Sequence, residues 1–191
     1  MKAISISGSL RENVGKKDAK QNRKKGLVPC VVYGGKEQVH FLVEEEAFDS
    51  LIFTPYTFSV DLNIEGKEFH AILQEIQFHK VTGSILHVDF LEVNPTKPVV
   101  LSIPINYTGN PQGVLKGGKL IKKFRKLKVK GLISNMPDDI TIDLSSLDIL
   151  DTCKVGDLNL ENLESLDPKS SVIAFVKSTR AVVEEGGEAK K

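Results

Sequence analysis

The chain has 191 residues, of which 40% are apolar and 27% are charged, with a formal net charge of +1. This length and apolar content exclude a chain that is disordered throughout and suffice for one large or two ordinary domains. The two cysteines, Cys30 and Cys153, lie far apart and suggest neither a disulfide framework nor a zinc site, and no apolar run is long enough to span a membrane. We therefore expect a soluble, cytoplasmic protein without metal or cofactor.

The first 25 residues are strongly basic. They carry eight basic and two acidic side chains, whereas residues 26–115 carry four basic and eleven acidic ones. Alternation over 4–7 predicts a strand, residues 16–25 read as a short helix that ends at Gly26, and 28–33 read as a buried strand. Segregated positive charge of this kind can hold an anionic polymer, although a solvated lysine-rich face is the alternative.

Further strands follow with a period of two, over 39–43, 58–64, 69–73 and 85–91. A turn at 65–67 predicts a β-hairpin within 57–76, and 44–52 begins with acidic residues as a helix does. Pro95 and Pro98 then stiffen the chain and mark a boundary. We expect a first domain over 1–94.

The second half continues with predicted strands over 99–105, 127–129, 140–144 and 172–176, and we expect a second domain over 95–177. Residues 116–130 form another basic block, with eight basic and no acidic side chains. From residue 178 the apolar rhythm is lost, so 178–191 is expected to be a disordered tail. The fold class is mainly β with short helices, in two domains.

Three features suggest a binding or catalytic role. His87 and Asp89 lie two apart on a predicted strand and so emerge on one face, where they form either a functional pair or an exposed polar strip. Because an aspartate is repelled by phosphates, Asp89 near RNA would read a base edge or orient a basic side chain such as Arg11. Tyr33, before Gly34, could stack on a base or pack at a strand end. Residues 113–119 match GxxxxGK, a phosphate-loop pattern, but lack the Ser or Thr that ligates magnesium.

A family resemblance rests on motifs in both halves. Arg11 with Gly15-Lys16, the run 29–35 (PCVVYGG) and the run 87–90 (HVDF) resemble the family of bacterial large-subunit ribosomal protein twenty-five, which binds 5S ribosomal RNA. In the second half, 109–114, 117–120 and 142–147 are similar to the C-terminal domain of its longer form, general stress protein CTC.

The resemblance implies an N-terminal β-barrel-like domain that docks on the minor-groove side of a 5S RNA loop, followed by a second, mainly β domain. Its implied partners are 5S RNA and large-subunit neighbours, with no membrane and no small-molecule substrate. The implied RNA contacts are Arg11, Lys16, Lys20, Arg23, Tyr33, His87 and Asp89. Position 20 is usually arginine in the family, and lysine keeps the charge but loses the planar fork.

Three functions compete at this point. The first is a structural RNA-binding protein of the ribosome, which is not an enzyme and has no catalytic residues. The second is a phosphate-handling enzyme that uses the 113–119 loop. The third is a stress-related adaptor whose second domain binds protein.

Overall fold

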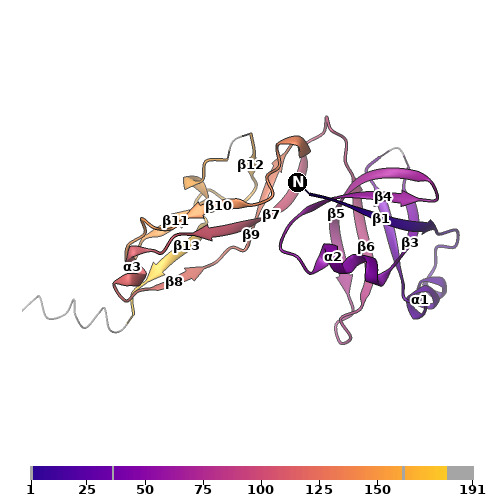
Figure 1. Ribbon diagram of the computed structural model, residues 1–191, viewed down its shortest axis with the longest axis horizontal. Coiled ribbons are helices and arrows are strands. Elements are labelled where there is room, and N and C mark those ends of the chain that lie inside the picture. The colour runs from indigo at the N-terminus through magenta and orange to yellow at the C-terminus, as the bar shows by residue number, and fades with distance from the viewer. Residues whose placement is uncertain (1, 36, 161, 180–191) are drawn as a thin grey trace, which may run out of the picture. The chain divides into compact units, whose positions relative to one another are not determined.

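The computed structural model describes residues 2–35, 37–160 and 162–179. Strands hold 48% of the described residues and helices 15%, which confirms the expected mainly β class. The chain divides into two compact units (Figure 1). The first runs to Val99 and includes Leu132–Ser134, and the second holds Val100–Gly131 and the residues from Asn135 on.

The first unit is a closed six-stranded barrel in the order β1-β3-β2-β6-β5-β4. Most neighbours are antiparallel, but β1 runs parallel to β4 and β2 runs parallel to β6. The barrel strands are β1 (Lys2–Leu10), β2 (Leu27–Tyr33), β3 (Val39–Glu44), β4 (Phe58–Ile64), β5 (Lys67–Phe78) and β6 (Ile85–Glu92). The parallel pairs require long crossovers, and one of these carries the helix α1 (Lys16–Lys24).

Alternating side chains build the barrel core. The inward positions of every strand are apolar, and Phe41 and Phe90 are completely buried with ring centroids 5.9 Å apart. Between β3 and β4 the expected helix over 44–52 is a 3-10 turn, η1 (Glu45–Phe48), followed by one α-helical turn, α2 (Asp49–Ile52). Its Phe48 and Leu51 join the same core.

The second unit contains two sheets, which Figure 1 shows as extended strands. One sheet has the order β10-β7-β9-β12, and the other has the order β11-β13-β8. Its strands are β7 (Val99–Thr108), β8 (Lys119–Lys122), β9 (Lys126–Gly131), β10 (Ile140–Asp143), β11 (Thr152–Lys154), β12 (Glu164–Ser165) and β13 (Val172–Lys177). Short turns link them: α3 (Gln112–Leu115), η2 (Ile133–Asn135) and η3 (Val155–Asp157).

The structure does not test the expected domain boundaries or the expected C-terminal tail. The boundaries 1–94 and 95–177 stay predictions, and the expected tail 178–191 lies outside the described residues from residue 180 on. Within the described ranges, no helix is long and apolar enough to cross a membrane.

Candidate nucleic-acid interface

The helix α1 presents one polar-basic face to solvent and another face to the barrel. Asp18, Ala19, Asn22 and Arg23 are at least half-buried, and their spacing places them on one side of the helix. The remaining helix positions, among them Lys16, Lys17, Lys20 and Lys24, are exposed. Lysine side chains project freely from this face, as contacts with a phosphate backbone require. The helix ends as predicted, because Gly26 has a φ of +78° and donates its N–H to the Arg23 carbonyl.

Arg11 holds the segment before the helix in place through hydrogen bonds. Its Nε donates to Asp18 Oδ2 at 2.7 Å and its other guanidinium nitrogen donates to the Gly15 carbonyl at 3.2 Å. Asn22 Nδ2 donates to the same Asp18 oxygen at 3.0 Å, and only 7% of the Arg11 side chain is exposed. Asp18 is therefore the carboxylate that orients Arg11, and the alternative that Asp89 does so is wrong. The RNA contact expected of Arg11 itself stays a prediction.

Arg23 joins the helix to the polar face of β6. Its Nε donates to the Leu86 carbonyl at 2.9 Å, one residue before His87. This hydrogen bond joins residues 63 apart in the chain and brings the basic helix beside the strand that carries His87 and Asp89. Two motifs that were separate in the sequence therefore form one surface.

His87 and Asp89 point out of the barrel, as their spacing predicts, and contact each other. His87 Nδ1 lies 2.5 Å from Asp89 Oδ1, and about a quarter of each side chain is exposed, 29% and 25%. The strand register places Gln77 opposite His87 and Glu75 opposite Asp89 on β5. This strip combines carboxylates, an imidazole and an amide, which suits base edges and hydroxyls better than phosphates.

Sequence reasoning missed Glu75 and Gln77. The register of β5 shifts between Leu73 and Glu75, so simple alternation along the strand fails there. A β-bulge of this kind re-aims the following side chains. The cluster of polar residues in 74–77 was the available signal.

Tyr33 ends β2 on the same outer face, half-buried and paired in register with Leu91. Gly34 is required by its backbone conformation and by close packing, whereas at Gly35 a side chain would displace the flexible Glu92 carboxylate. A Cβ on Gly34, whose φ is +97°, would lie 2.6 Å from Leu91 Cδ1, and a Cβ on Gly35 would lie 1.8 Å from the Glu92 carboxylate. The tight turn fixes where Tyr33 sits at the edge of the polar strip.

Cys30 lies behind this face and is 1% exposed. Burial, and to a smaller extent the charge of Asp89, raises the pKa of its thiol well above the usual range. The thiol is therefore protonated at neutral pH and packs as a small apolar side chain. Across the described ranges, no three His, Cys, Asp or Glu residues gather as a metal site would require.

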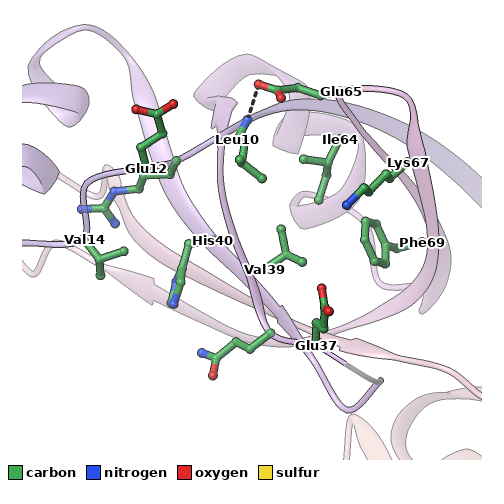
Figure 2. Close-up of a pocket in the computed structure, with 12 residues that line it drawn as sticks. Leu10, Glu12, Val14, Glu37, Val39, His40, Ile64, Glu65, Lys67 and Phe69 are labelled. Carbon is green, nitrogen blue, oxygen red and sulfur yellow. Dashed lines mark hydrogen bonds between the residues drawn. The ribbon is translucent and has the colours of Figure 1, made fainter.

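A hollow of about 400 Å³ opens on the barrel beside the loop that follows β1. Figure 2 shows its apolar side chains, Val39, Ile64 and Phe69 among them, with carboxylates around them. Glu12, Glu37 and Glu65 contribute these carboxylates, and the Leu10 N–H donates to Glu65 Oε1 at 3.1 Å. Arg11 and Lys67 line the same hollow, so its charges are mixed and it differs in character from the basic face of α1.

The 113–119 loop is built differently from a phosphate cradle. A strand, β8, follows it where a phosphate loop needs a helix. Its N–H groups are used within the protein, because Gly113 donates to the Leu147 carbonyl and Gly118 donates to the Gly113 carbonyl at 2.8 Å. The enzyme alternative therefore has no structural support.

Comparison with known proteins gives two family matches. Residues 6–90 match the ribosomal L25p family, and residues 98–180 match the C-terminal domain of ribosomal protein TL5. A protein of Porphyromonas gingivalis is 46% identical over all of both chains, and one of Phocaeicola vulgatus is 45% identical over 95% of each. A third, from Cytophaga hutchinsonii, is 40% identical over all of both chains. All three carry the name large ribosomal subunit protein bL25.

Proposed function

We propose, from the premise that this chain belongs to the ribosomal L25p family, that it binds 5S ribosomal RNA through α1 and the polar strip of its barrel. It is a structural protein of the bacterial large ribosomal subunit and not an enzyme, and it is therefore ribosome-associated and cytoplasmic.

The observation that carries the proposal is the hydrogen bond from Arg23 to the Leu86 carbonyl. It brings a helix with four exposed lysines beside the paired strands β6 and β5, which together carry an imidazole, two carboxylates and an amide. RNA requires both kinds of group on one surface, because phosphates give affinity and base edges with 2′-hydroxyls give specificity.

We assign the roles by exposure and charge. Lys16 and Lys20 neutralise phosphates, while His87 and Asp89 read base edges or hydroxyls, with Tyr33 beside them as a stacking surface. Arg23 and Arg11 act mainly by position, since their guanidinium groups donate to protein oxygens.

The experiment measures binding of the full chain to isolated 5S RNA over a range of salt concentrations. For each phosphate contact removed, the slope of log affinity against log salt should flatten by about 0.7 to 0.9. Lys16→Ala and Lys20→Ala should each flatten it. Lys67→Ala is the matched control, because Lys67 is an exposed lysine of the same unit that lies on β5 and not on α1. Equal slopes in all three variants would contradict the proposal.

A further inference from the structure

The basic side chains of the second block, residues 116–130, lie on the surface of the second unit. All eight of its lysines and arginines are exposed. In the part of the chain that the structure describes, ion pairs engage two of them, Lys116 with Asp148 and Lys130 with Glu164 at 4.0 Å. A concentrated positive charge therefore remains over β8, β9 and the connection between them.

The strand β9 places three of these basic side chains on one face. Leu127 and Val129 are completely buried, so Lys126, Lys128 and Lys130 all stand on the opposite, exposed face. Alternate residues of a strand are about 6.7 Å apart. Because Lys130 pairs with Glu164, Lys126 and Lys128 are the two cations that this row offers to an extended chain of phosphates.

The connection from β8 to β9 is held rigidly. Lys123 and Phe124 both donate their N–H groups to the Ile173 carbonyl, at 2.8 and 3.4 Å. Tyr107 donates its hydroxyl to the Phe124 carbonyl at 2.6 Å, and the Arg125 carbonyl accepts from the Ile105 N–H at 2.9 Å. The side chains of Lys123 and Arg125 therefore project from a fixed backbone, which lowers the entropy lost when they bind.

The composition of the block favours RNA over a protein partner. Protein interfaces are depleted in lysine and are anchored by buried aromatic residues. Here two aromatic side chains beside the block make cation–π contacts with its lysines. Lys122 Nζ lies 4.8 Å from the centre of the Tyr107 ring, and Lys123 Nζ lies 5.4 Å from the centre of the Phe175 ring. Between positions 119 and 130 the apolar side chains are at least half-buried, so an anchor for protein is missing from this described stretch.

We propose that the exposed basic strip of the second unit, Lys119, Lys122, Lys123, Arg125, Lys126 and Lys128, binds the phosphate backbone of ribosomal RNA. The chain thus has two separate RNA-binding surfaces, one on each unit. This inference does not depend on the 5S contact proposed for the first unit, because it rests on different residues.

The test compares two double variants of the full chain. Lys123→Gln with Arg125→Gln removes two charges from the strip, and Lys154→Gln with Lys169→Gln removes two from exposed positions elsewhere on the same unit. Affinity is measured for isolated 5S RNA and for large subunits prepared without this protein. The strip variant should lose about tenfold in affinity for at least one of them at physiological salt, with a salt slope flatter by roughly 1.4 to 1.8. The control should match the wild type.

The two binding arms identify the RNA. A loss on isolated 5S RNA assigns the strip to that molecule, and a loss on subunits alone assigns it to another ribosomal RNA. Ultraviolet irradiation of loaded subunits should attach nucleotides to the peptide that contains 119–128. The proposal is overturned if the strip variant and the control bind alike, or if crosslinks from this peptide lead to protein and carry no nucleotide. A cooperative thermal unfolding transition, measured for each variant, serves as the control that the variant is folded.

Discussion

Replacing Asp18 by asparagine distinguishes two roles of Arg11. If Arg11 holds the segment before α1 in place, loss of the Asp18 charge loosens the helix and weakens binding to 5S RNA. If Arg11 instead contacts phosphate directly, the same change frees its guanidinium and removes a repelling carboxylate, so binding becomes tighter.

The size of the effect follows from the geometry. Asp18 Oδ2 accepts from both Arg11 Nε, at 2.7 Å, and Asn22 Nδ2, at 3.0 Å. A hydrogen bond to a charged group contributes about 1.5–3 kcal/mol, and an unpaired buried charge costs more. Because 31% of the Asp18 side chain is exposed, water replaces part of the interaction. We expect Asp18→Asn to lower the free energy of unfolding of the first unit by about 1–2 kcal/mol.

The assay has a stability arm and a binding arm. Amide hydrogen exchange of residues 16–24 follows the docking of α1 without assuming that the two units unfold together. Affinity for 5S RNA should fall, at most by a factor of about 5 to 30. Glu12→Gln is the matched control, since Glu12 is an exposed carboxylate on the same segment, and its effect on stability should stay within ~0.5 kcal/mol.

A double-mutant cycle with Arg11→Gln completes the experiment. If the pair acts as the structure indicates, the two changes should be coupled by at least about 0.5 kcal/mol. Tighter binding of Asp18→Asn to 5S RNA, or an absence of coupling, would refute the positioning role of Arg11.

Three further predictions concern other parts of the molecule. Asp89→Asn should weaken binding to the native 5S loop by roughly 1–3 kcal/mol and leave binding to an unrelated duplex nearly unchanged; an unchanged ratio of the two affinities would make the polar strip a mere exposed face. Gly34→Ala should lower the thermal midpoint more than Gly66→Ala, because both have a positive φ but only the first Cβ, 2.6 Å from Leu91 Cδ1, would clash; equal effects would contradict the packing argument. Burial, followed by the charge of Cys153, raises the pKa of Tyr107 to about 12, so the phenol stabilises the second unit below about pH 10 and this contribution is lost as pH rises through 12. Tyr107→Phe should remove that part of the alkaline destabilisation, followed by thermal midpoints across this range, and an unaltered pH profile would contradict it.

Local patterns predicted most of the strands. The alternating runs over 39–43, 58–64 and 85–91 lie within β3, β4 and β6, and the turn at 65–67 joins β4 to β5. The period of two works here because each barrel strand has one buried and one exposed face. The helix over 16–25 was also found, since Gly26 supplies its stop signal.

Pairing over long distances could not be predicted in the same way. The parallel neighbours of β1 and β2 are set by barrel closure, which residue alternation does not encode. Sequence reasoning missed the strand β8, Lys119–Lys122, because only its two central residues, Leu120 and Ile121, are apolar and they lie between lysines. It missed β12 because that strand has only two residues. In the candidate site, the spacing of His87 and Asp89 predicted their common face, whereas the partner of Arg11 required coordinates.

The hydrogen bond from Arg23 to the Leu86 carbonyl has a consequence for synthesis of the chain. The helix is made early, but its anchor on β6 follows 63 residues later. At about 5–20 residues per second, the ribosome needs roughly 3 to 13 seconds to supply that anchor. Contacts between residues this far apart also form slowly after release. During this interval the nascent chain carries its cationic segment without the surface that gives it selectivity, so discrimination among RNAs is acquired only when the barrel closes.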